Sequence, residues 1–202
     1  MLTKQLNKIA SKIADPDIPD REPDVIKAYK TKLWYLDQNR SFFITPDGEK
    51  RWLKNGVLHR EDGPAVISSN GNEAWYLNGQ PHREDGPAIE EANGAKEWYL
   101  NGRRHRKDGP AVEYPDAKVW YLNGKRHRED GPAVEYIDGT KEWYLNGKLH
   151  RENGPAVEEA DRAKEWYLNG KQVKSKDYDS PDFQERWKKL VELERVRQVM
   201  ED

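Results

Sequence analysis

Short apolar and aromatic runs recur along this chain at a fixed period, and polar turn residues separate them. Tryptophan marks the period with successive spacings of 23, 23, 22, 23 and 23 residues, at positions 52, 75, 98, 120, 143 and 166. In one unit, a β-prone segment at 133–136 is followed by a turn containing Gly139 and by a second β-prone segment at 141–145. Asn146 and Gly147 then reverse the chain again. The pattern predicts two short antiparallel strands in each unit.

The repeats predict a mainly β fold, an elongated antiparallel β-meander or solenoid of about six 23-residue, two-stranded repeats, with short helices at both ends. The unit that begins at Trp98 is one residue shorter, and we place the deletion in its turn at 114–117. Upstream, Trp34 and the segment 42–48 resemble an eroded copy of the repeat. We therefore expect an N-terminal helix and linker at 1–31, a β-repeat domain at 32–172 and a C-terminal helix at 173–202.

Both ends of the chain carry helix signals. Near the N-terminus, Leu2, Leu6, Ile9 and Ile13 lie at helical spacing, which predicts a short helix that packs on the first repeat. At the other end, Ser180 and Pro181 are typical of a helix start. An apolar stripe follows at Phe183, Trp187, Leu190, Leu193, Val196 and Met200. We expect this helix to cap the sheet edge; the alternative is a helix that mediates a homodimer or binds a partner.

The alternation of side chains along each second strand separates two aromatic columns. The tryptophan column is interpreted as a structural core, the alternative being a platform for ligand stacking; it comprises Trp52, Trp75, Trp98, Trp120, Trp143 and Trp166. Tyrosine follows each tryptophan from Trp75 onward and points to the other face. No obvious layer covers that face, so its tyrosines are our candidates for partner binding: Tyr76, Tyr99, Tyr121, Tyr144 and Tyr167.

The run Trp-x-x-Asn-Gly-Lys-Arg-His, followed by Tyr-Ile-Asp-Gly-Thr-Lys-Glu-Trp, resembles the MORN repeat and its bacterial variants. The resemblance covers Trp34 to about Lys171, and it implies units of about 23 residues with two strands each. The chain departs from the family in having arginine, where glycine is usual, after the histidine. MORN-like proteins mostly scaffold or bind other proteins, and some bacterial and phage members resemble antitoxins. The resemblance thus implies protein binding.

Composition narrows the classes of function. The chain of 202 residues has 35 basic and 37 acidic residues, so its net charge of −2 does not favour nucleic acid or anionic lipid as a partner. It contains no cysteine, which excludes disulfides and thiolate metal sites. No segment has the roughly 18 consecutive apolar residues of a membrane helix, and the first residues lack the apolar core of a signal peptide. We expect a cytoplasmic protein without a cofactor and without membrane contact.

All five histidines occupy one repeat position, and an arginine follows each of them. The pairs are His59 and Arg60, His82 and Arg83, His105 and Arg106, His127 and Arg128, and His150 and Arg151. Identical groups on a ladder do not converge on one point as catalysis requires, so we expect no enzyme. Rungs about 9.5 Å apart also cannot share a zinc ion, so we expect no metal site. The arginines could pair with acids in their own repeat, meet an acidic partner, or bind nucleotides or nucleic acid.

The sequence therefore predicts a non-enzymatic binding module for a partner protein, as an inhibitor, antitoxin or immunity-type factor in a bacterial or phage setting. The alternatives are nucleotide or nucleic-acid binding through the His-Arg ladder, and a structural role in an assembly.

Overall fold

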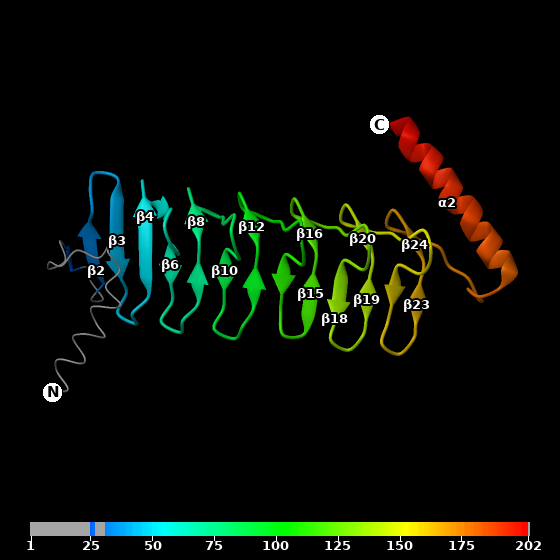
Figure 1. Ribbon diagram of the computed structural model, residues 1–202, viewed down its shortest axis with the longest axis horizontal. Helices are drawn as coiled ribbons and strands as arrows, with labels where there is room; N and C mark the ends of the chain where they lie inside the picture. The colour runs from blue at the N-terminus through cyan, green and yellow to red at the C-terminus, as the bar shows by residue number, and fades with distance from the viewer. Residues whose placement is uncertain (1–24, 27–30, 202) are drawn as a thin grey trace. The chain divides into compact units, whose positions relative to one another are not determined.

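The computed structural model describes residues 25–26 and 31–201, with side chains for residues 31–200 (Figure 1). The chain divides into two compact units. The first extends to His82 and includes Ala88–Ala92, and the second comprises Arg83–Pro87 and the residues from Asn93 onward. The predicted mainly β, antiparallel fold with a C-terminal helix is confirmed. The predicted N-terminal helix lies outside the described residues.

The first unit is an antiparallel meander whose early strands are the longest. Its sheet follows chain order, β1 (Val25–Ile26), β2 (Lys32–Tyr35), β3 (Arg40–Ile44), β4 (Lys50–Lys54), β6 (Val66–Ile67), β7 (Glu73–Ala74) and β10 (Ile89–Glu90). The core of this unit is aromatic: the Phe42 ring lies 5.3 Å from Trp34 and 4.7 Å from Trp52, centroid to centroid. All three side chains are buried. The eroded repeat thus supplies the apolar core that starts the sheet.

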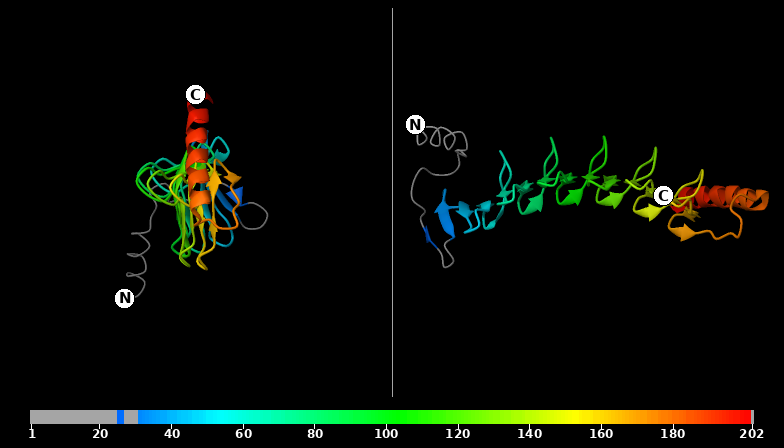
Figure 2. Two further views of the ribbon diagram at one scale, coloured as in Figure 1. Left: turned by 90° about the vertical axis from the view of Figure 1, so that its right-hand side faces the viewer. Right: turned by 90° about the horizontal axis from the view of Figure 1, so that it is seen from below.

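The second unit continues the same pattern with shorter strands. Its sheet order is β11 (Lys96–Glu97), β14 (Val112–Glu113), β15 (Ala117–Val119), β18 (Val134–Tyr136), β19 (Lys141–Glu142), β22 (Val157–Glu158) and β23 (Lys164–Glu165). Valines at paired positions fill one face, and Val112, Val119 and Val134 form a buried cluster against Tyr121 and Tyr144. The strands lie one after another in a single layer (Figure 2).

Each repeat adds a second strand pair that the periodicity alone did not predict. The change of partner occurs at the tryptophan. The Trp120 N–H still donates to the neighbouring main-sheet segment, at the Ala133 carbonyl (2.8 Å), whereas the Trp120 carbonyl accepts from the His127 N–H (3.1 Å), which follows the small hairpin. The next residues form a separate small hairpin. These hairpins are β12–β13 (Tyr99–Leu100, Arg103–Arg104), β16–β17 (Tyr121–Leu122, Lys125–Arg126), β20–β21 (Tyr144–Leu145, Lys148–Leu149) and β24–β25 (Tyr167–Leu168, Lys171–Gln172).

The first unit has two counterparts of these hairpins. One is β8–β9 (Tyr76–Leu77, Gln80–Pro81), and the other is β5 (Val57–Leu58), which pairs with β4. In the second unit the hairpins form a row along one side of the sheet strands (Figure 1).

Every small hairpin turns at an Asn-Gly pair. Asn123 has φ 51° and Gly124 has φ 81°, the left-handed values that a type I′ turn needs at both central positions. Asparagine tolerates this conformation better than other residues with a side chain. Four turns between main-sheet strands use a left-handed glycine instead, at Gly48, Gly71, Gly94 and Gly139, and the turn at 159–162 uses Arg162 with φ 74°. At 114–117 the short repeat closes a tighter turn, in which the Tyr114 N–H donates to the Ala117 carbonyl at 2.8 Å. The deletion therefore lies where the sequence placed it.

The C-terminal helix α2 (Pro181–Glu201) packs on the last repeat. Phe183, Trp187 and Val191 are buried against Trp166 and Leu168. The Trp187 Nε1–H donates to the Glu152 carbonyl at 2.7 Å, and the Ser180 hydroxyl accepts from the Phe183 N–H at 3.3 Å, as an N-cap does. Beyond Val191 the stripe is exposed at Leu193, Val196 and Met200, and Val199 beside it is exposed too.

Candidate functional site

In four of the five His-Arg pairs, the arginine lies over the tryptophan ring of its own repeat. The Cζ atoms of Arg60, Arg106, Arg128 and Arg151 are 4.3, 3.9, 4.1 and 3.7 Å from the ring centroids of Trp52, Trp98, Trp120 and Trp143. Such stacking is a cation–π contact, and the planar guanidinium covers the ring as an apolar side chain would. Trp52 and Trp166 are buried, whereas Trp75, Trp98, Trp120 and Trp143 are half-buried. Arginine is thus part of the packing in these loops.

The Gly-Pro turn of each loop closes the other side of the guanidinium. A Cβ atom at Gly131 would lie 2.9 Å from Arg128 Cζ, so glycine leaves the room that the arginine needs. Arg128 also donates from Nε to Asp130 at 3.0 Å and from an Nη atom to the Pro132 carbonyl at 3.2 Å and to Glu135 at 2.9 Å. The hydrogen bond from Arg128 holds the pKa of Asp130 below its ordinary value. The guanidinium is therefore used within its own repeat.

The other loops have the same contacts with small changes. Arg83 donates to Asp85 at 2.9 Å, and Arg106 donates to Glu113 at 2.8 Å. Arg151 has Asn153 in place of the aspartate, yet it still donates to Glu158 at 2.6 Å. Each arginine that the sequence singled out for an anion or an acidic partner has an acidic partner in its own loop or in the strand that follows.

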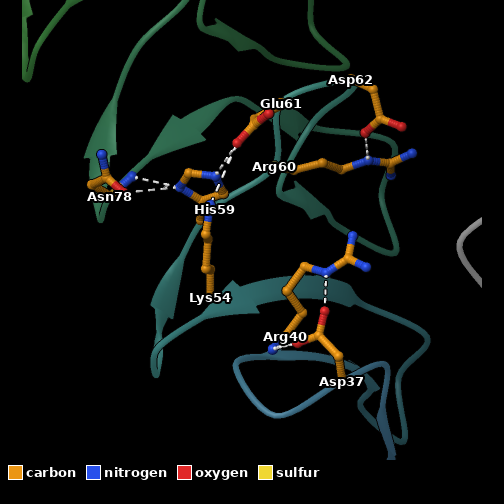
Figure 3. A network of polar contacts seen from close by, with 8 residues as sticks. All are labelled: Asp37, Arg40, Lys54, His59, Arg60, Glu61, Asp62 and Asn78. Carbon is orange, nitrogen blue, oxygen red and sulfur yellow. Dashed lines mark hydrogen bonds and ion pairs between the residues drawn. The ribbon is translucent and has the colours of Figure 1, made fainter.

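Figure 3 shows the first of these loops, in which Arg60 donates to Asp62 at 3.0 Å. His59 lies between Glu61 at 3.2 Å and Asn78 at 3.1 Å, and the hydrogen bond from His59 lowers the pKa of Glu61. A second ion pair, from Arg40 Nε to Asp37 at 2.7 Å, lies nearby, and hydrogen bonding from Arg40 lowers the Asp37 pKa to about 2.

The histidines link one repeat to the next. His127 Nδ1 accepts from the backbone N–H of Asn146 at 3.2 Å, and His105 and His150 accept from Asn123 and Asn169 at the same distance. Each histidine thereby supports the left-handed asparagine of the following hairpin. At His150, an Nδ1 atom that accepts this hydrogen bond carries no proton, which fits a neutral imidazole. Burial lowers the pKa of His150, which favours the same neutral form.

On the tyrosine face of the second unit, arginine side chains lie beside three of the rings. Arg104 Cζ lies 5.8 Å from the Tyr99 ring centroid and 5.5 Å from that of Tyr121, and Arg126 Cζ lies 5.1 Å from that of Tyr144. The five tyrosines that the sequence proposed as an uncovered stripe, Tyr76, Tyr99, Tyr121, Tyr144 and Tyr167, are half-buried. In the two central repeats, tyrosine and arginine therefore alternate in one column.

A buried carboxylate anchors this column. Glu97 accepts from the Tyr99 hydroxyl at 2.8 Å, from the Tyr114 hydroxyl at 2.5 Å and from Arg104 Nε at 3.0 Å. Burial alone would raise the pKa of Glu97, but the hydrogen bonds from Tyr114 and Tyr99 and the charge of Arg104 outweigh it, so the pKa is lowered. The hydrogen bond to Glu97 raises the Tyr114 pKa to about 12. Tyr99, Tyr114 and Arg104 are thus joined through hydrogen bonds to Glu97.

The opposite face of the second sheet carries an alternating charge ladder. Cross-strand partners follow one another as Lys96, Glu113, Lys118, Glu135, Lys141, Glu158 and Lys164. Opposite charges directly across a strand pair stabilise each other. The three glutamates of the ladder also form ion pairs with Arg106, Arg128 and Arg151.

The tips of the small hairpins differ from both faces. One basic residue follows each Asn-Gly turn in the second unit, and all four are exposed: Arg103, Lys125, Lys148 and Lys171. Within the part of the chain that the structure describes, none of these four, which we call the hairpin row, forms an ion pair. An open, shallow groove between the two central hairpins is lined by Tyr99, Tyr121, Arg103 and Lys125, among others.

Sequence reasoning missed the hairpin row, because the residue at this position changes from repeat to repeat. The signal in the sequence is the residue directly after Asn-Gly. This residue is Val57 or Gln80 in the first unit and is basic in every later repeat.

In comparisons with known proteins, no family model and no curated protein matches the chain. Among residues 31–200, no three histidine or acidic side chains form a group that could hold a metal ion. None of the helices in the described ranges is long and apolar enough to cross a membrane.

Proposed function

We propose that the chain is a non-enzymatic binding module that contacts a partner protein through the hairpin row and the adjoining column of tyrosine and arginine. The observation that carries this proposal is the contrast between two basic rows. The loop arginines are stacked on tryptophan and paired with acids, whereas the hairpin row has no acidic partner among the described residues. Protein interfaces favour aromatic rings and arginine, and unpaired charges beside them attract a partner of opposite charge.

The partner surface should be acidic, because the hairpin row places four positive charges on a chain whose net charge is −2. The narrower role of inhibitor, antitoxin or immunity-type factor in a bacterial or phage setting rests on the resemblance to MORN-like repeats. Nucleotide or nucleic-acid binding through the His-Arg ladder has less support, because those guanidinium groups already contact rings and carboxylates.

The proposal is tested by affinity capture from extracts of the source cells with three baits. They are the wild-type chain, a hairpin variant (Arg103→Gln, Lys125→Gln, Lys148→Gln) and a control variant (Lys118→Gln, Lys141→Gln, Lys164→Gln) that removes the same charge from the opposite ladder. Quantitative mass spectrometry should find a protein retained by the wild type and the control but lost from the hairpin variant. Equal recovery by all three baits would contradict the proposed face.

A further inference from the structure

The hairpin row is a stacked ladder of four cations, each one repeat from the next. A Cβ atom at Gly124 would lie 3.6 Å from Arg103 Cβ, one at Gly147 would lie 3.6 Å from Lys125 Cβ, and one at Gly170 would lie 3.7 Å from Lys148 Cβ. The aliphatic stems of Arg103, Lys125 and Lys148 thus rest on the turn glycine of the next hairpin. This packing fixes the start of each side chain and leaves the charged end in water.

The ladder has a regular pitch. Each repeat contributes two strands to the sheet, and adjacent strands lie about 4.8 Å apart, so the cations recur about every 9.5 Å along the repeat axis. A partner that lies along the row must present negative charge at that interval and on one side.

A polyproline II helix meets both conditions. It has three residues per turn and rises about 3.1 Å per residue, so every third side chain points to the same side at intervals of about 9.3 Å. An extended β-strand repeats its side chains on one face about every 6.7 Å, which does not match the ladder. Duplex DNA presents phosphates every 3.4 Å or so along each strand, and the strand turns away from a straight row within a few base pairs.

The groove between the central hairpins adds a second match. Tyr99 and Tyr121 line it beside Arg103 and Lys125. Aromatic side chains in a shallow groove are the usual contacts of proline-rich segments in this conformation, which are bound at little entropic cost because they are already extended.

From these matches we infer that the hairpin row binds an acidic, proline-rich segment of the partner in the polyproline II conformation, with a carboxylate at every third residue. This inference rests on the proposed function and names the chemistry of its partner. The tyrosines contact the proline rings, and the four cations meet successive carboxylates.

The test uses synthetic peptides and purified full-length chain, with fluorescence anisotropy as the readout. The first peptide is Glu-Pro-Pro repeated four times. The second has the same composition with its glutamates in one block, and the third is Glu-Gly-Ser repeated four times, which keeps the spacing without the helix. A single-stranded oligothymidine of equal charge is the fourth probe.

We expect Glu-Pro-Pro to bind at least about tenfold more tightly than the block peptide and the Glu-Gly-Ser peptide, because it is preorganised at the right spacing. The hairpin variant should lose this binding, and the control variant should keep it. Equal affinity for the block peptide would show charge attraction without spacing, and tighter binding of oligothymidine would show a nucleic-acid surface. Either result, or no binding of Glu-Pro-Pro, overturns the inference. The proposed function is tested separately, by affinity capture with the hairpin variant. A protein that is captured through the hairpin row would support that function even if the peptide experiment overturned the inference.

Discussion

At the scale of single residues, arginine replaces an apolar side chain as the partner of tryptophan. A thin sheet cannot bury both faces of an indole ring, and the described central tryptophans stay half-buried. The guanidinium covers the ring, and its hydrogen bonds to acids and to the proline carbonyl satisfy its donors. The chain thereby builds a repeat from 36% charged residues with few large apolar ones.

Truncating tryptophan should therefore have unequal effects along the column. Trp52 is 3% exposed, and Trp52→Ala should destabilise its unit by about 3–5 kcal/mol, as for a buried aromatic side chain. Trp120→Ala loses a half-buried ring and its contact with Arg128, so we expect only about 1–3 kcal/mol. Denaturant unfolding measures both free energies, with Trp120→Phe as a control that keeps an aromatic ring. Equal losses at the two sites would show that arginine does not cover the ring as described.

His150 gives the fold a dependence on pH between about pH 5 and pH 7. Its pKa is lowered in the folded chain, mainly because of burial, so the unfolded chain binds more protons in this range. Stability is fully present above the unfolded pKa and is lost as the pH falls through the folded one. The difference in unfolding free energy between the wild type and His150→Gln should therefore shrink from pH 7 to pH 5. A difference that stays constant or grows on acidification would contradict the assignment.

At the scale of elements, the Asn-Gly hairpin has the same turn residues in every repeat. Asn123 has φ 51°, and its N–H donates to His105 of the preceding repeat. Asn123→Ala should cost about 1–2 kcal/mol, because an alanine side chain strains the left-handed conformation. Asn123→Gly relieves that strain and loses only the side-chain contact, so it should cost less. Thermal unfolding of the two variants separates backbone strain from the histidine contact; if glycine is as destabilising as alanine, the turn conformation is not what asparagine contributes.

Helix α2 is a cap fixed by its first half. Trp187 is 3% exposed and contacts Trp166, so Trp187→Ala should cost about 3–5 kcal/mol and release the helix from the last repeat. Hydrogen exchange should then become faster in β22 and β23. The matched control is Leu193→Ala, because Leu193 is 66% exposed and should leave exchange unchanged. Protection that survives Trp187→Ala would mean that the last strands are stable without a cap.

The periodicity predicted the repeat, its reversals and the deletion at 114–117, because turn glycines and the tryptophan spacing are properties of the chain itself. It could not predict the second hairpin, since the break at Trp120 depends on a hydrogen bond to Ala133, 13 residues away. The stacking of Arg128 on Trp120 was missed for the same reason: periodicity assigns faces, but not which loop folds back onto a ring. Arg103 and Lys125 were missed because the comparison of repeats selected positions with identical residues, and the residue type at their position varies between repeats.

At the scale of the whole molecule, charge is divided among surfaces in spite of a nearly neutral total. In the second unit, the ladder from Lys96 to Lys164 alternates in sign, and the loop arginines lie beside acids. The hairpin row is basic without such compensation among the described residues. The repeat thus keeps most of its charge for its own stability and presents one row to a partner.

Site-specific photo-crosslinking tests this division most directly. A photoreactive residue in place of Lys125 lies on the hairpin row, and one in place of Lys118 lies on the alternating ladder of the main sheet, seven residues earlier in the chain. We expect the partner protein to crosslink through position 125 and not through position 118, with the crosslink abolished when Arg103 and Lys148 are changed to glutamine. Crosslinks through position 118 alone would contradict the hairpin row as the binding face.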